Sequence, residues 1–239
     1  IHKDILKAQT LILEQKYQEA IDTYETILKE SPEDEIKVKI FYQLGDLFSI
    51  NLSKNKEAII YYKKIREVTA DPLWLVKSEE RVGEVSFIYL RDYDQSIKSY
   101  KKLSSFKPKL QNYDFYEYRL ALSLMSNKNY VKSEENLINI SKIPNHAYRL
   151  ISIYQLGHLY FEQKKWQKAI STWTSYLRKE QKRENVVRTK FLLANVYETI
   201  EELKKAYDLY YSILSEYPNT EVVQSRLESI YARRVARKR

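Results

Sequence analysis

Apolar and polar positions along this chain repeat with helical spacing, and the same pattern occurs six times. The clearest copies are 17–24 (YQEAIDTY), 93–100 (YDQSIKSY) and 166–173 (WQKAISTW), in which an aromatic residue, a small residue and a second aromatic residue share one helical face. The small residues that anchor the six copies are Ala20, Ala58, Ser96, Ser133, Ala169 and Ala206. Their spacing of 36 to 38 residues predicts a series of repeated helical units.

A second small residue precedes each anchor by twelve or thirteen positions. This second series is Ala8, Gly45, Gly83, Ala121, Gly157 and Ala194, and it contains all three glycines of the chain. Because glycine inside a helix costs roughly 1 kcal/mol relative to alanine, its use here predicts a close helix–helix approach. Each unit is therefore expected to be a helix A, a short polar turn and a helix B. Units two and three have one extra residue between their two small positions.

The spacing in two units resembles the tetratricopeptide repeat. The residues that carry the resemblance are Leu156, Gly157, Tyr160, Trp166, Ala169, Trp173 and Tyr176 in one unit, and Ala8, Tyr17, Ala20, Tyr24, Ile27 and Pro32 in the other. The closing segment 210–230 also resembles the last repeat of bacterial envelope proteins of this class, such as the outer-membrane-assembly lipoprotein and the Tol-associated cell-division coordinator.

This resemblance implies an all-α fold, a right-handed α-solenoid of about six helical hairpins with a C-terminal capping helix. The expected single domain spans 1–239, with units at 1–34, 35–72, 73–110, 111–145, 146–182 and 183–218, and a capping helix at 219–236. Asn219 or Thr220 is the expected N-cap of that helix, and the expected apolar positions are Val222, Val223, Leu227, Ile230 and Tyr231. The five prolines fall at or just beyond the ends of the B helices, where a helix stop is expected.

In the tetratricopeptide-like arrangement, the A helices line a concave face and present side chains at fixed offsets from their small residue. The expected partner-binding residues of this groove are Tyr42, Asp46, Glu80, Glu84, Phe87, Tyr118, Leu122, Tyr154, His158, Phe161, Phe191 and Asn195. Tyrosine combines apolar area with a polar tip, so an aromatic stripe suits recognition of a peptide, helix or loop. The alternative is that these rings pack between successive A helices.

Composition narrows the function further. Cysteine is absent, and the three histidines have no ligand spacing, so we expect no cofactor and no metal site. No serine lies in a nucleophile-elbow context, and the chain is predicted not to be an enzyme. Three glycines and five prolines predict that turns with a left-handed backbone are few.

The net charge of +9 lies entirely beyond residue 120, because residues 1–120 carry 20 basic and 20 acidic side chains. Two stretches, 178–190 and the C-terminal ARRVARKR, are predicted to form one basic edge if the last units fold together. The residues of this expected edge are Arg178, Lys179, Lys182, Arg183, Arg233, Arg234, Arg237, Lys238 and Arg239. Such an edge suits an acidic partner, nucleic acid or anionic lipid, whereas a solvated helix end explains it without a partner.

The sequence therefore favours a non-catalytic scaffold that binds another protein along the A helices, within a multiprotein envelope assembly. The alternative is a nucleic-acid-binding module that uses the basic C-terminal half. No apolar run is long enough to span a membrane, so membrane association is expected only through a partner or a lost N-terminal anchor. The resemblance of the last repeat favours a bacterial periplasm or cell envelope over the cytoplasm.

Overall fold

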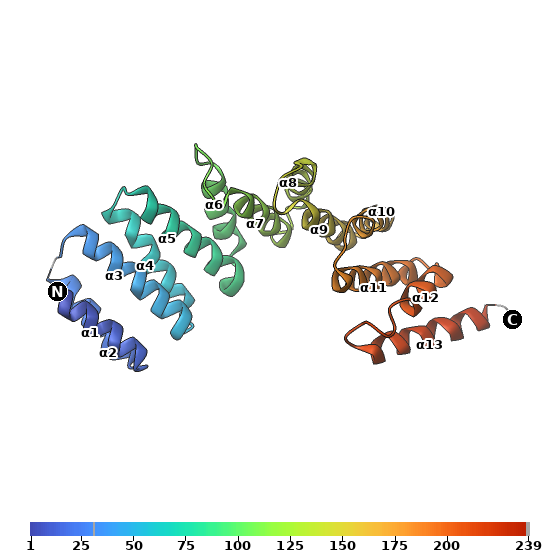
Figure 1. The fold of residues 1–239 in the computed structure, drawn as a ribbon, viewed down its shortest axis with the longest axis horizontal. Helices are drawn as coiled ribbons and strands as arrows, with labels where there is room; N and C mark the ends of the chain where they lie inside the picture. Colours follow the sequence, from blue (N-terminus) through green and yellow to red (C-terminus); the bar gives the residue numbers. More distant parts are fainter. Residues whose placement is uncertain (31, 238–239) are drawn as a thin grey trace. The chain divides into compact units, whose positions relative to one another are not determined.

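The computed structural model describes residues 1–30 and 32–237, which form thirteen α-helices and no strand (Figure 1). The A helices are α1 (His2–Leu13), α3 (Asp34–Asp46), α5 (Pro72–Val85), α7 (Tyr113–Ser126), α9 (Arg149–Glu162) and α11 (Arg183–Thr199). The B helices are α2 (Tyr17–Lys29), α4 (Asn55–Val68), α6 (Tyr93–Ser104), α8 (Tyr130–Lys142), α10 (Trp166–Leu177) and α12 (Leu203–Tyr211), and α13 (Thr220–Ala236) ends the series. The all-α prediction and the alternation of A and B helices are confirmed.

The chain forms two compact units, with the boundary after Lys128. Unit 1 contains α1 to α7, and its hairpins α1–α2, α3–α4 and α5–α6 are followed by α7, which packs on α6. Unit 2 begins at Asn129, contains α8 to α13, and pairs α9 with α10 and α11 with α12. The boundary divides the expected unit 111–145, since α7 belongs to one unit and α8 to the other. The expectation of a single domain stays a prediction.

The extra residue of units two and three is accommodated at the end of helix A. There α3 and α5 continue as single π-helical turns, η1 (Leu47–Asn51) and η2 (Ser86–Leu90). A π turn takes up one additional residue without ending the helix. The insertion seen in the sequence therefore changes the winding of helix A and leaves the start of helix B in register.

The turns between A and B helices correct one prediction. Each of the six turns has one residue with a left-handed backbone, five positions before the anchor of helix B, and none of these is glycine. The six residues are Gln15, Ser53, Arg91, Lys128, Lys164 and Glu201, with φ between 52° and 63°. A left-handed residue after a helix is a common helix ending, and non-glycine residues adopt it singly at a cost of about 1 to 2 kcal/mol. Glycine scarcity was thus a poor guide to these turns.

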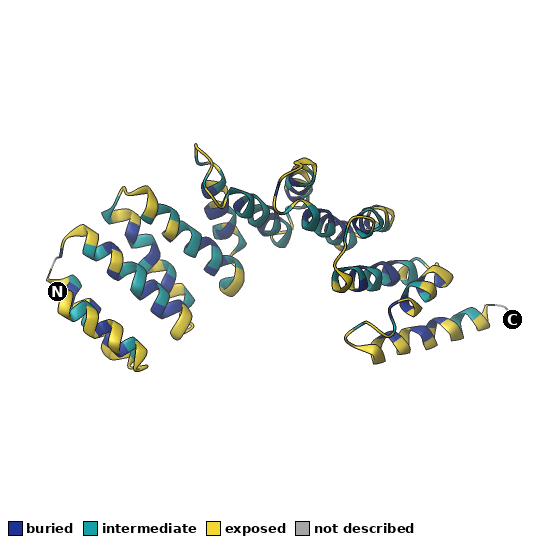
Figure 2. Cartoon of the chain, viewed as in Figure 1, coloured by how far each residue is buried: buried dark blue, intermediate teal, exposed yellow. Residues whose placement is uncertain are grey.

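Figure 2 shows that buried residues occur on both the A and the B helices. At the three glycines of the A helices, the nearest atoms belong to side chains of the following B helix. A methyl group on Gly157 would lie 2.1 Å from Nε1 of Trp173, and one on Gly45 would lie 2.4 Å from the Tyr62 ring. Both distances are far below van der Waals contact. The close approach predicted from the glycines is confirmed, but the group that approaches is an aromatic ring rather than a backbone.

Helix α13 packs on α12 and covers the end of the α11–α12 hairpin. Asn219 is its N-cap, and the Asn219 side chain accepts a hydrogen bond of 3.1 Å from the backbone N–H of Val222. Val223, Leu227 and Ile230 are buried as expected, whereas Val222 and Tyr231 are exposed, Tyr231 by 62%. Across the described residues, no helix has both the length and the apolar character needed to cross a membrane.

Candidate functional site

All the residues predicted to line a groove are half-buried, and they lie on A helices or on the π turn η2. Half-burial fits either a ligand surface or a seam between neighbouring helices, so their contacts decide what each residue does. Unit 1 holds Tyr42, Asp46, Glu80, Glu84, Phe87, Tyr118 and Leu122, and unit 2 holds Tyr154, His158, Phe161, Phe191 and Asn195.

In unit 1, Asp46 and Tyr42 join α3 to its neighbours. The Tyr62 hydroxyl donates a hydrogen bond of 2.6 Å to Asp46, and burial, together with this bond, raises the pKa of Tyr62 above its ordinary value. Nε of Arg81 lies 3.3 Å from the Asp46 carboxylate and donates to the Tyr42 hydroxyl at 3.2 Å. The same guanidinium donates to Glu84 at 3.1 Å. These groove residues are therefore engaged within the chain.

The aromatic stripe is interrupted at Glu80 because this carboxylate connects α5 to α7. Its side chain accepts hydrogen bonds from the Tyr116 hydroxyl and, at 3.4 Å, from the Asn112 amide. Next to it, the Arg119 guanidinium lies 5.0 Å from the centre of the Phe87 ring, which is cation–π distance. Much of the unit 1 stripe is thus a seam between A helices, and its role as a partner contact stays a prediction.

A feature that the sequence did not reveal is that B-helix side chains reach the A helices. In three of the units, the residue four positions after the anchor contacts the residue that follows the small position of helix A. Tyr62 meets Asp46 in this way, Tyr210 donates a hydrogen bond to Asn195, and the Trp173 ring lies 5.2 Å from the His158 ring. In these units the sequence has an aromatic residue four positions after the anchor and a polar or aromatic residue one position after the small residue of helix A. Only the geometry of the hairpin shows that the two side chains are in contact.

His158 packs against two aromatic rings, since the centre of the Tyr154 ring is also near, at 4.6 Å. Burial lowers the pKa of His158 to about 4. In the unfolded chain the imidazole titrates near pH 6.5. As the pH falls from 6.5 to 4, the unfolded state therefore binds a proton that the folded state does not, and stability falls.

We expect this histidine to lower the free energy of unfolding by about 2 to 3 kcal/mol between pH 7 and pH 4. His158→Gln removes the titrating group, so the difference in stability between the two proteins should change over this range. Urea unfolding at several pH values measures it, and carboxylate titrations cancel in the difference. A difference that stays constant from pH 7 to pH 4 would contradict the buried neutral imidazole.

Unit 2 contains an open depression of about 420 Å³ between α9, α11 and α13, which we name the A-face pocket. Phe161 and Phe191 provide its aromatic surface. Three of its residues are predicted groove residues, and one belongs to the predicted basic edge. The lining residues are Phe161, Phe191, Asn195, Glu198, Thr199, Glu201, Arg226 and Arg233.

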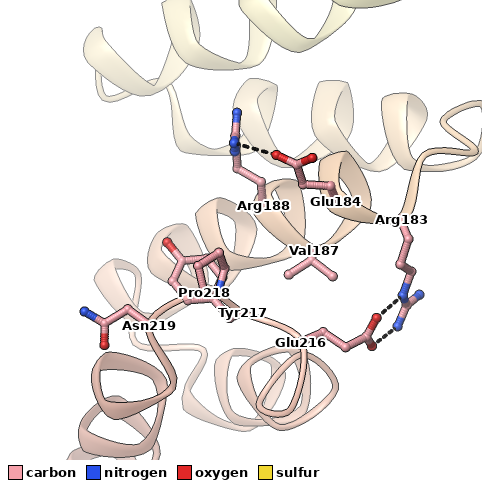
Figure 3. Close-up of a pocket in the computed structure, with 8 residues that line it drawn as sticks. All are labelled: Arg183, Glu184, Val187, Arg188, Glu216, Tyr217, Pro218 and Asn219. Carbon is pink, nitrogen blue, oxygen red and sulfur yellow. Dashed lines mark hydrogen bonds and ion pairs between the residues drawn. The ribbon is translucent and has the colours of Figure 1, made fainter.

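A second depression, of about 350 Å³, lies at the other end of α11, against the segment that leads into α13 (Figure 3). Figure 3 shows the Arg183 guanidinium facing the Glu216 carboxylate, with Val187 between this pair and Tyr217. Tyr217 stacks on Phe191 with ring centres 4.3 Å apart. Because Phe191 lines the A-face pocket and Tyr217 lines the second depression, this stacked pair separates the two.

The structure does not bring the two basic stretches together. Arg183 pairs with Glu216 ahead of α13, whereas Arg233 pairs with Glu198 and Glu201 near the end of α11. Residues 183 and 198 are about 22 Å apart along a helix that rises 1.5 Å per residue. Arg237 also pairs with Glu201, and Arg234 lies over the Tyr207 ring.

The other members of the expected basic edge are either elsewhere or not described. Arg178, Lys179 and Lys182 are exposed between α10 and α11, and Lys238 and Arg239 lie outside the described residues. The described members therefore form two groups at opposite ends of the α11–α13 pair rather than one edge.

Comparison with known proteins gives the fold. No protein-family model matches the chain, and no curated protein matches its sequence. Among solved structures, the type IV pilus biogenesis factor PilW is similar over 96% of this chain and 97% of its own, at a TM-score of 0.58 and 12% identity. The apo form of RapI is similar over 100% of this chain and 99% of its own, at a TM-score of 0.57 and 14% identity. This chain has the tetratricopeptide-repeat fold.

The apo form of the quorum sensor NprR from B. thuringiensis also has this fold over 96% of the chain and 68% of its own, with a TM-score of 0.54 and 15% identity. The A-face pocket lies beside the A helices α9 and α11 of unit 2. These structural similarities establish the architecture, but at 12 to 15% sequence identity they do not indicate which partner the chain binds.

Proposed function

We propose that the chain is a non-catalytic protein-interaction module that binds a peptide segment of a partner protein in the A-face pocket of unit 2. The observation that carries the proposal is the pocket itself, where two half-buried aromatic rings lie open between three helices. Its volume of about 420 Å³ is in the range of ligand pockets. Aromatic rings held by neighbouring rings supply contact area at low cost in conformational entropy.

The surrounding contacts support a preformed site. Phe191 is held between Tyr217, at 4.3 Å, and Tyr210, at 5.6 Å between ring centres. Phe161 lies 5.4 Å from Trp166 and 5.9 Å from Trp173. Because both rings are fixed before a ligand arrives, binding does not have to order them. The similar structures include a quorum sensor and a pilus biogenesis factor, so the fold leaves the partner open.

A bulky residue at position 199 tests the pocket directly. Thr199 is exposed, lines the pocket, and its hydroxyl donates only to the Asn195 carbonyl of its own helix, at 2.8 Å. Peptides are first selected on the wild-type chain from a phage-displayed random library. Thr199→Trp should fill the pocket and weaken their binding by at least about tenfold. Fluorescence anisotropy with labelled synthetic peptides measures the affinity.

Ser171→Trp is the matched control. Ser171 is also exposed on a helix of unit 2, α10, and its hydroxyl also donates to a carbonyl of its own helix, that of Lys168, at 3.0 Å. This variant should bind the peptides with wild-type affinity. Equal affinity of all three proteins would contradict the pocket assignment, and a selection that enriches no peptide would contradict the proposed function.

A further inference from the structure

We propose that the segment bound in the A-face pocket is acidic, with a carboxylate that pairs with Arg226 beside an apolar side chain that packs on Phe161 and Phe191. This inference rests on the proposed function and names the chemistry of its ligand. It follows from the distribution of charge at the pocket rim, from the incomplete pairing of one guanidinium, and from the position of the two rings.

The pocket lining has two carboxylates, Glu198 and Glu201, and two guanidiniums, those of Arg226 and Arg233. A third guanidinium, that of Arg237 beside the pocket, also pairs with Glu201, so the ion-pair cluster as a whole has more cations than anions. The cluster therefore has a net positive charge even when every ion pair is formed. A carboxylate from a ligand balances this charge, whereas a basic segment adds to it.

Glu198 is the centre of this cluster, and both of its oxygens are already used. Oε1 receives a hydrogen bond from Nη1 of Arg233 at 3.1 Å, and Oε2 lies 3.2 Å from the Tyr210 hydroxyl, which shares its single proton between Glu198 and Asn195. The Glu198 side chain is only 12% exposed. It is thus a satisfied, nearly buried anion that holds α11, α12 and α13 together.

Arg226 is left with the weakest pairing of the three arginines. Its Nη1 lies 3.5 Å from the same Glu198 oxygen that Arg233 occupies, which is an ion pair at the limit of a hydrogen bond. Arg233, in contrast, donates hydrogen bonds to both Glu198 and Glu201. The Arg226 side chain is 52% exposed. A guanidinium has five N–H donors arranged to bind a carboxylate through two of them, so Arg226 can accept a second anion without losing Glu198.

The apolar part of the ligand is placed by the rings. Phe161 and Phe191 line the same pocket as Arg226, so a carboxylate bound to Arg226 brings its neighbouring side chain over aromatic surface. An aliphatic or aromatic neighbour gains from leaving water there, whereas a polar one does not. The ligand class is therefore an acidic residue adjacent to a large apolar residue.

A nucleic-acid strand fits these observations less well. Binding a strand requires several free cations along the backbone. Arg233 and Arg237 already hold Glu201, and Arg183 holds Glu216. Only Arg226 among the pocket arginines combines high exposure with weak pairing, and one cation suits a single carboxylate.

The test selects peptides from a phage-displayed random library on the wild-type chain and measures their affinity for charge variants by fluorescence anisotropy. We expect the selected peptides to share Asp or Glu beside Leu, Ile, Phe or Trp. Arg226→Gln should weaken the binding of these peptides about tenfold, and Arg226→Glu should weaken it further. Replacing the acidic residue of a peptide by lysine should restore binding to the Arg226→Glu variant and abolish it for the wild type.

Arg178→Glu is the matched charge reversal outside the pocket, on an exposed arginine at the end of α10, and should leave affinity unchanged. Thermal melts of the Arg226→Gln variant establish that the protein is folded. Basic consensus peptides, or acidic peptides that bind the Arg226 variants as well as the wild type, would overturn the inference. Displacement of the peptides by single-stranded oligothymidylate at low salt would also overturn it.

The outcomes separate the two proposals. If peptides bind the wild type, lose affinity for Thr199→Trp and bind the Arg226 variants with unchanged affinity, the pocket assignment is supported and the acidic ligand is wrong. If no peptide is enriched, both proposals fail together.

Discussion

Replacing Trp173 by alanine should lower the free energy of unfolding by about 3 to 5 kcal/mol, the usual cost of deleting a large buried aromatic side chain. Trp173 is 0% exposed, and it fills the space between α9 and α10. Its Nε1 donates a hydrogen bond of 3.1 Å to the Tyr154 carbonyl. Alanine therefore leaves a cavity and removes this hydrogen bond. Urea unfolding followed by far-UV circular dichroism measures the loss.

Trp166→Ala is the control for this prediction. Trp166 is the first residue of the same helix, is half-buried, and packs edge-on against Phe161. We expect a loss of about 1 to 2 kcal/mol, because less apolar area is removed from its packed environment. Equal losses for the two tryptophans would contradict the assignment of Trp173 to the core.

Replacing Gly157 by alanine should destabilise the protein by about 1 to 3 kcal/mol. The added methyl group would lie 2.1 Å from Nε1 and 2.3 Å from Cδ1 of Trp173, so the ring has to move and lose its hydrogen bond. Overpacking of this kind typically costs about 1 to 3 kcal/mol. The gain of up to about 1 kcal/mol in helix propensity offsets only part of the cost. The same unfolding measurement reports the change.

Gly83→Ala is the matched control, because a methyl group there would lie 3.2 Å from its nearest neighbours in Ser99 and Tyr100. Its effect should stay within about 1 kcal/mol of zero, since the helix propensity gained compensates a small adjustment. The double variant Gly157→Ala with Trp173→Tyr should lose less than the sum of the single variants. This pair copies Ala194 and Tyr210, which are fully buried in the α11–α12 hairpin. Additive losses would contradict the direct clash.

Much of the fold was predictable because helices are specified by local spacing. The anchors at Ala20 and Ala169 are fully buried, and so are the small residues Ala8 and Ala194. A helix repeats its faces every 3.6 residues, so a stripe of small and aromatic positions indicates which face is buried before any partner is known. The N-cap at Asn219 was predictable for the same reason, since its bond reaches only three residues along the chain.

The candidate site was predicted only in part. Phe161, Phe191 and Asn195 do line one pocket, but Asp46 and Glu80 connect helices. The offsets from a small residue determine which face of helix A a side chain occupies. They do not determine whether a neighbouring helix already uses that side chain, because this depends on residues 16 to 36 positions away.

The sequence by itself determined that the chain is helical, that A and B helices alternate, and that Trp166, Trp173 and Tyr176 belong to helix B. These properties follow from contacts within one or two helical turns. Only the tertiary structure decided the left-handed turns, the rings that pass from B helices to the A helices, and the separation of the basic stretches. Those properties depend on which helices pack together. The lysines and rings at 160–177 are neighbours in the sequence, but packing divides them between the core and the solvent.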